Sequence, residues 1–93
     1  NLKRANLRGV RLDLGNSGGC LASLEDADLE GADLSNANLT TVIARNTNFT
    51  HVNLVNANLS KVDLIGANFS DANLSGANLS EANLADAFLS DAN

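Results

Sequence analysis

The sequence predicts an all-β solenoid, a tube wound from short extended segments, and two observations carry this prediction. From Ala22 to Asn93 one pattern recurs every five residues, with a large apolar residue at the centre of nearly every repeat. Neither an α-helix nor a flat strand gathers residues five apart on one face, because a helix rotates them by ~140° and a strand alternates its faces. A chain that turns the same way once per repeat does gather them, and it therefore winds into stacked coils.

The centres of the repeats define the predicted core. Eleven of the fourteen centres are Leu and two are Phe, and a small residue, usually Ala, stands two positions before each. Asn or Asp stands between the two in eleven of the fourteen repeats. Residues two apart point the same way from an extended segment, so the small residue and the centre fill the tube together. The fourteen centres are Leu24, Leu29, Leu34, Leu39, Ala44, Phe49, Leu54, Leu59, Leu64, Phe69, Leu74, Leu79, Leu84 and Leu89.

The repeated motif resembles that of the pentapeptide-repeat family, which Ala27-Asp28-Leu29 and Ala57-Asn58-Leu59 match as they stand. The resemblance implies a right-handed quadrilateral β-helix with four pentapeptides per coil, and here about four to four and a half coils. With that period, Phe49 and Phe69 should stack directly. Two inner columns are then expected, one of Leu24, Ala44, Leu64 and Leu84, and the other of Leu29, Phe49, Phe69 and Leu89.

The whole chain, residues 1–93, is predicted to be a single pentapeptide-repeat domain in three parts. Residues 1–12 carry the repeat in a different phase, centred on Leu2, Leu7 and Leu12. Residues 13–23 interrupt the register with a glycine-rich loop, and the repeat is continuous over residues 22–93. Because the sequence starts without Met and stops at Asn93 within a repeat, we expect a fragment, a processed form or a longer chain.

Charge is distributed unevenly along the chain, whose net charge is −5. Residues 1–12 hold four basic residues, Lys3, Arg4, Arg8 and Arg11, whereas the remainder holds two basic and eleven acidic residues. Two interpretations stay open: outward positions tolerate any charge, or the basic segment meets an acidic partner or the acidic side of another copy. The negative net charge disfavours nucleic acid and anionic membrane as partners, and no apolar run is long enough to span a bilayer.

Residues with catalytic or ligand chemistry are few. Cys20 and His51 are the only residues of their kinds, so they predict neither an internal disulfide nor a zinc site. Paired acids such as Asp28 and Asp33 follow from the repeat and do not indicate acid–base catalysis. We therefore expect no catalytic, cofactor-binding or metal residues, no small-molecule substrate and no enzymatic activity.

The leading functional hypothesis is a non-catalytic rigid scaffold or interaction module with an unidentified protein partner. This is what resemblance to short bacterial, especially cyanobacterial, members implies, in the cytoplasm, or in the thylakoid lumen or periplasm if a signal peptide has been removed. The alternative is a binder of a DNA-processing enzyme such as gyrase, by resemblance to quinolone-resistance members that mimic DNA with an acidic rod. No column of this chain stays acidic, however, and an ice-binding face would need more Thr than the chain offers.

Two further expectations concern packing and contacts. Ala44 replaces Leu in its column, which predicts a local narrowing or cavity. The outward-facing apolar residues Ile43, Ile65 and Phe88 are candidates for a contact surface. The C-terminal rim, near Phe88 and Leu89, is expected to be covered by further repeats, a tail or a second copy, so that the chain is a monomer or a weak end-to-end dimer.

Overall fold

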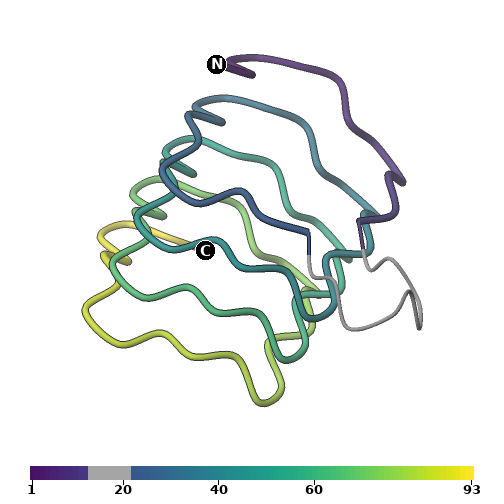
Figure 1. Ribbon diagram of the computed structural model, residues 1–93. Helices are drawn as coiled ribbons and strands as arrows, with labels where there is room; N and C mark the ends of the chain where they lie inside the picture. The colour runs from purple at the N-terminus through teal and green to yellow at the C-terminus, as the bar shows by residue number, and fades with distance from the viewer. Residues whose placement is uncertain (13–21) are drawn as a thin grey trace.

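The computed structural model describes residues 1–12 and 22–93, which wind into a stack of coils (Figure 1). Neighbouring coils are joined by single-residue parallel β-bridges, and the two described ranges contain no helix and no longer strand. From the Ser23–Ile43 bridge onward, partners lie twenty residues apart. Each coil therefore holds four five-residue units, which is the period that the family resemblance implied.

Each unit consists of a short extended segment and a tight turn. In the unit centred on Leu29, the Leu29 amide donates to the Asn48 carbonyl of the next coil at 2.9 Å. The Ala32 amide then donates back to the Leu29 carbonyl at 2.9 Å, which closes the turn. In every described turn the second residue after the centre has a positive φ, as in a type II turn. The regular change of chain direction therefore comes from one left-handed residue per unit.

Most of these left-handed positions are not occupied by glycine. Four are Gly, and the other twelve are residues such as Thr41, Lys61 and Glu81, with φ between 54° and 63°. A side chain in this conformation costs ~1–2 kcal/mol relative to the right-handed region. The hydrogen bonds between coils and the buried core must offset this cost at each corner.

The stacked units form four inner columns, one on each side of the tube. We name each side by its inner residue in the coil formed by residues 42–61. The Ala44 side contains Leu24, Ala44, Leu64 and Leu84; the Phe49 side contains Leu2, Leu29, Phe49, Phe69 and Leu89; the Leu54 side contains Leu7, Leu34, Leu54 and Leu74; the Leu59 side contains Leu12, Leu39, Leu59 and Leu79.

The core is tightest in the middle of the stack. All centres from Leu29 to Phe69 are at most 1% exposed. The Phe49 and Phe69 rings stack with centroids 4.8 Å apart and planes 7° from parallel, which confirms the predicted stacking. Leu24, Leu74, Leu79 and Leu84 are half-buried, and exposure reaches 42% at Leu2 and 46% at Leu89.

Residues 1–12 supply three units of the coil that precedes Leu24. Asn6 bridges Asp33 and Arg11 bridges Asn38, a separation of 27 residues instead of twenty. Relative to a regular coil, seven residues are therefore added between Leu12 and Leu24. The different phase of residues 1–12 reflects this addition within one tube. Most of the predicted 13–23 loop, residues 13–21 with Cys20, lies outside the described residues.

The Ala44 position differs from its neighbours in its hydrogen bonds. Ala44 and Val42 are both 1% exposed. The turn bond from the Thr47 amide to the Ala44 carbonyl is 3.4 Å, the longest of the turn bonds among the described residues. The buried Thr47 hydroxyl donates to the Leu24 carbonyl in the preceding coil at 2.7 Å. The narrowing at Ala44 stays a prediction, while Thr47 adds a bond that an Ala at this position could not make.

Candidate functional site

The outward Asn and Asp side chains cap the turns. The Oδ1 atom of Asp33 accepts a hydrogen bond from the Ser35 amide at 3.0 Å, and Asn58 does the same for Ser60 at 3.0 Å. This side-chain-to-backbone bond is an Asx turn, in which Asn and Asp are favoured because their oxygen reaches the amide two residues on. The acidic and amide residues of the repeat are thus explained by local structure rather than by catalysis.

Two apolar residues depart from this pattern. Ile43 and Phe88 occupy the bridge position that Asn or Asp fills in most units, and they pair with Asp63 and Asn68. An apolar side chain offers no acceptor, so neither turn receives a side-chain cap. A typical hydrogen bond contributes about 0.5–1.5 kcal/mol net to the free energy of unfolding. At these two positions the chain lacks that bond and carries an apolar side chain on its outer surface.

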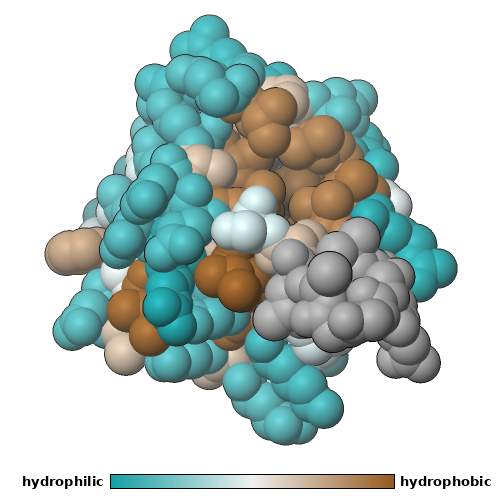
Figure 2. All heavy atoms as spheres, viewed as in Figure 1, coloured by the Kyte–Doolittle hydropathy of each residue, from teal (hydrophilic) through white to brown (hydrophobic). Residues whose placement is uncertain are grey.

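The structure places two of the three predicted contact residues on the same side of adjacent coils. Ile43 bridges Asp63, two residues before Ile65, and both Ile side chains are half-buried on the Ala44 side. Phe88 belongs to the neighbouring Phe49 side and is 61% exposed. On the face displayed in Figure 2, brown apolar side chains interrupt the teal surface at separate places. Phe88 therefore belongs to a different side of the tube from the two Ile residues.

An ion pair joins the two coils that carry the Ile residues. Both Nε and Nη2 of Arg45 lie 2.8 Å from the same oxygen of Asp63, which belongs to the next coil. The pair holds the Arg45 side chain against the Ala44 side and orients its guanidinium. We refer to Ile43, Arg45, Asp63 and Ile65 as the Ala44-side patch.

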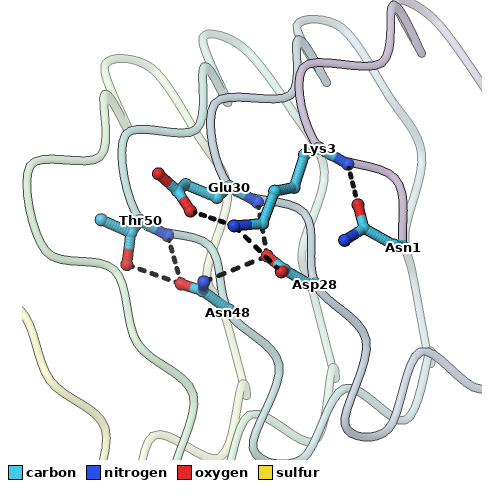
Figure 3. Close-up of polar contacts among 6 residues, drawn as sticks. All are labelled: Asn1, Lys3, Asp28, Glu30, Asn48 and Thr50. Carbon is cyan, nitrogen blue, oxygen red and sulfur yellow. Dashed lines mark hydrogen bonds and ion pairs between the residues drawn. The ribbon is translucent and has the colours of Figure 1, made fainter.

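A second polar cluster joins residues 1–12 to the following coil (Figure 3). The Lys3 ammonium lies 2.8 Å from Glu30 and 3.4 Å from Asp28. Asp28 also accepts hydrogen bonds from the Glu30 amide at 3.3 Å and from the Asn48 side chain at 3.1 Å. In the same view Thr50 donates to Asn48 at 2.6 Å, so the polar contacts continue into a third coil.

These contacts change the acid–base properties of the cluster. The hydrogen bond from Lys3 to Glu30 raises the pKa of Lys3 above its ordinary value and lowers the pKa of Glu30. For Asp28, partial burial acts to raise the pKa, but the Glu30 amide and Lys3 outweigh it, so the pKa falls below the ordinary value. All three groups therefore keep their charges over a wider pH range than free side chains would.

Arg8 forms a matching contact on the Leu54 side. Its guanidinium lies 3.3 Å from the Asp33 carboxylate. The backbone hydrogen bond from Ser35 lowers the pKa of Asp33, and Arg8 lowers it further. Two basic residues of the first twelve thus have acidic partners within the same chain.

This internal pairing is a third explanation for the basic segment, which sequence reasoning missed. Neither surface tolerance nor an external partner is needed for Lys3 and Arg8. Two signals could have revealed the pairing: the basic residues fall in residues 1–12, and five acids crowd residues 25–33. A shift of 27 residues places Lys3 over Glu30. The same pairing neutralises acids that a DNA-mimicking column would need to present.

The remaining residues with ligand chemistry do not form a metal-binding cluster within the described ranges. The His51 side chain is 59% exposed and lies 3.8 Å from the Asp71 carboxylate. Within residues 1–12 and 22–93, no group of three or more His, Cys, Asp or Glu side chains could hold a metal ion. The same ranges contain no helix long and apolar enough to cross a membrane.

Comparison with known proteins identifies the repeat. Residues 22–60 and 57–93 match the family described as "Pentapeptide repeats (8 copies)". The chain is similar to a solved pentapeptide repeat protein from the Arabidopsis thaliana thylakoid lumen, with a TM-score of 0.84 and 28% identity over 100% of this chain and 59% of that one. It is also similar to one from Nostoc PCC 7120, with a TM-score of 0.71 and 36% identity over 94% and 64%.

A third similar structure comes from a cyanobacterial protein described as involved in heterocyst differentiation regulation, from Nostoc sp. strain PCC 7120. Its TM-score is 0.59 and its identity 31%, over 99% of this chain and 48% of that one. The chain spans about half to two thirds of the length of these three proteins. Comparison with curated protein sequences gave no match.

Proposed function

The chain belongs to the pentapeptide-repeat family, and from that premise we propose that it is a non-catalytic scaffold, a rigid right-handed four-sided rod that presents a protein-binding surface. Rigidity is supported by the hydrogen bonding. Within the described residues, twelve backbone hydrogen bonds join residues 22–41 to the next coil, and twelve more join residues 42–61 to the coil after it. Side chains at fixed places on such a rod keep fixed mutual distances, which suits the binding of a folded partner without an ordering cost.

The observation that carries this proposal is the Ala44-side patch. Ile43 lacks the turn cap that most other units have, and Ile65 is a second apolar residue on the same side of the next coil. Arg45, two residues after Ile43, forms an ion pair with Asp63, two residues before Ile65. Apolar side chains around an Arg are typical of the energetically important centres of protein interfaces.

The proposed partner is a protein, not a nucleic acid, a membrane or a small molecule. The net charge of −5 opposes binding to polyanions. For the compartment we propose the cytoplasm, thylakoid lumen or periplasm, the lumen being that of the Arabidopsis neighbour. We propose that the chain acts as a monomer or a weak end-to-end dimer.

The test replaces the two Ile residues of the Ala44-side patch with polar residues that are usual at these positions of the repeat. A chain with Ile43→Asn and Ile65→Ser should fold at least as well as the natural chain, because Asn restores the missing cap. We expect cross-linked partners captured by the natural chain to be lost with this variant. The matched control, Thr40→Ala with Ser80→Ala on the Leu59 side, should retain them.

Equal capture by both variants would place the binding surface elsewhere. Inhibition of gyrase supercoiling by the natural chain would favour the DNA-mimic alternative and contradict the proposal. Melting temperatures of all three chains, measured in parallel, exclude unfolding as the cause of lost capture.

A further inference from the structure

The turn that follows Ile43 leaves one backbone donor without an acceptor. In most other units the Asn or Asp side chain accepts a bond from the amide two residues on, as Asp63 does from the Ile65 amide at 3.3 Å. Ile43 has no acceptor to offer, and among the described residues the Arg45 amide makes no hydrogen bond. In the capped turns this amide faces an outward side chain, so the Arg45 amide faces the outer surface of the Ala44 side.

The side chain of Arg45 provides further donors on the same residue. Its Nε and Nη2 atoms both lie 2.8 Å from one oxygen of Asp63, whose other oxygen accepts the Ile65 amide. A guanidinium carries five N–H groups, so donors remain for a second acceptor. A backbone amide and a guanidinium on one exposed residue suit a carboxylate, whose two oxygens accept charge-assisted hydrogen bonds.

The charge of the Ala44 side changes sign along the tube. Within the patch the charge of Arg45 is offset by Asp63, and Lys61, at the adjoining corner, is exposed and positive. Exposed acids flank the patch, two on the coil before it and two on the coil after it: Glu25, Asp26, Glu81 and Asp86. A partner segment that complements this side along the tube axis is therefore acidic near its centre and basic toward both ends.

A helix suits this side better than an extended segment does. Apart from Arg45, the patch residues have paired amides; the Asp63 amide, for example, donates to the Val42 carbonyl at 3.0 Å. One free donor cannot pair with a strand, which needs a row of donors and acceptors. A helix satisfies its own backbone groups, and it can present apolar side chains one turn apart to Ile43 and Ile65.

We propose that the partner docks an amphipathic helix on the Ala44-side patch, an inference that rests on the proposed function. The apolar side chains of the helix cover the two Ile residues, and one of its carboxylates accepts hydrogen bonds from the amide and guanidinium of Arg45. That carboxylate takes the place of the cap that Ile43 does not supply. Basic residues of the helix face the flanking acids. These acids lie three coil spacings of ~4.8 Å apart, so the basic residues are about eleven positions apart, or three helical turns.

The probe is a synthetic stapled helix with two Leu one turn apart, a Glu beside them and a Lys near each end of the same face. A second probe keeps the Leu residues and reverses the charges. Binding of each probe to the isotope-labelled full chain is followed by NMR. We expect the first probe to bind roughly 10-fold more tightly, as for several exposed ion pairs acting together, and to shift the signal of the Arg45 amide. Equal affinities, a preference for the reversed probe, or no binding at millimolar probe would overturn the proposal.

Two variants at one position isolate the contribution of the free amide. Ile43→Ala and Ile43→Asn both remove the apolar side chain, but only Asn can accept the Arg45 amide from within the chain. We expect the Asn variant to bind the first probe about 10-fold more weakly than the Ala variant, the loss expected for one hydrogen bond to a charged group. Equal affinities of the two variants would rule out the carboxylate site at Arg45. Thr40→Ala with Ser80→Ala, on the Leu59 side, should bind the probe as the natural chain does.

Failure of this inference can be distinguished from failure of the proposed function. If Ile43→Asn with Ile65→Ser loses its captured partners while the natural chain does not discriminate between the probes, the patch binds protein but not such a helix. If that variant captures the same partners as the natural chain, the proposed function fails, and the inference that rests on it fails as well.

Discussion

The Ala44 side and the Leu59 side are built from the same repeat, yet they differ in both core and surface. On the Leu59 side the described inner column is Leu throughout, and Asn38, Asn58 and Asn78 each cap the following turn at 3.0–3.1 Å. On the Ala44 side a Leu is replaced by Ala, and a cap residue is replaced by Ile43. From Ala37 onward the Leu59 side follows the consensus inside and outside, whereas the Ala44 side departs from it inside and outside at the same coil.

The difference separates what the fold requires from what it tolerates. A solenoid sums nearest-neighbour contributions from its repeats, so one weakened unit lowers stability without abolishing the structure. The residues that depart from the consensus on the Ala44 side therefore need not serve the fold. This is the physical reason for seeking the partner surface there rather than on the Leu59 side.

The largest expected effect comes from replacing an inner Leu of the Leu59 side with Ala, the residue that the Ala44 side carries in its column. Leu59→Ala removes a side chain with no exposed surface from the middle of its column. We expect a loss of about 2–5 kcal/mol of unfolding free energy, because the surrounding coils cannot collapse fully into the space. Denaturant unfolding monitored by circular dichroism measures this loss.

The reciprocal change, Ala44→Leu, should be tolerated if space is present beside Val42. A melting temperature several degrees below that of the natural chain would show that overpacking dominates. In that case the Ala44 side is narrow and well packed, and the comparison with the Leu59 side would need revision.

The next effect concerns a corner of the Ala44 side. In Gly66→Ala the new methyl group would lie 2.5 Å from Oδ1 of Asn46, whose side chain also donates to Asp26 at 3.2 Å. We expect a cost of roughly 1–2 kcal/mol from the left-handed backbone, plus the loss of this bond. Gly9→Ala is the matched control, because it has a similar φ of 64° and no atom within 4 Å of the added methyl. Equal destabilisation of the two variants, measured by chemical denaturation, would show that the Asn46 side chain moves aside at no cost.

A smaller effect is expected from exchanging the turn caps of the two sides. Ile43→Asn should add a hydrogen bond to the Arg45 amide and stabilise the chain by about 0.5–1.5 kcal/mol, and Asn58→Ile should destabilise it by a similar amount. Thermal unfolding of the two variants side by side measures both changes. A loss of stability in Ile43→Asn would mean that Ile43 contributes to the fold through packing, which would weaken its assignment to a partner surface.

The smallest expected effect concerns the ion pair between Lys3 and Glu30 on the Phe49 side and its dependence on pH. Because Lys3 lowers the pKa of Glu30, with a further contribution from His51, the ion pair stabilises the fold at neutral pH. That contribution is lost as pH falls below the ordinary Glu value of 4.5 through the lowered one. At the other end, the raised pKa of Lys3 keeps its contribution until pH rises above 10.5. Carboxyl NMR titration should show the pKa of Glu30 returning toward 4.5 in Lys3→Gln, and no change would mean that the pair is absent in solution.

Much of the fold could be predicted because one period controls it. A five-residue repeat fits neither a helix nor a flat strand, so a coiled chain could be derived from spacing. The four-unit period came from the resemblance to the pentapeptide-repeat family, and the inner columns and the stacking of Phe49 on Phe69 followed from that period. The pentapeptide-repeat family expected from the motif is confirmed by the comparisons. The Asn and Asp positions were identified as part of the repeat, but their role as turn caps required the backbone geometry.

The contact between residues 1–12 and residues 28–39 could not be predicted from the period, because the added residues between Leu12 and Leu24 change the register. Its charge complementarity was visible as composition, with basic residues at one end and acids at 25–33, yet a pairing needs the 27-residue offset. For the contact residues, a twenty-residue coil places Ile43 and Ile65 on the same side of adjacent coils and Phe88 on the neighbouring side, and the bridge register agrees. The ion pair between Arg45 and Asp63 could not be predicted, because it depends on side-chain conformation.

The four-unit coil has a consequence for how such a chain can evolve. Deleting or duplicating one five-residue unit leaves every inner column filled, but it turns all later residues by a quarter of the circumference. A change of four units restores the original direction and alters only the length. Each insertion or deletion of one unit therefore rotates the later residues by a quarter turn about the tube axis. Such a change can move a surface such as the Ala44-side patch to another side of the tube without changing the residues that compose it.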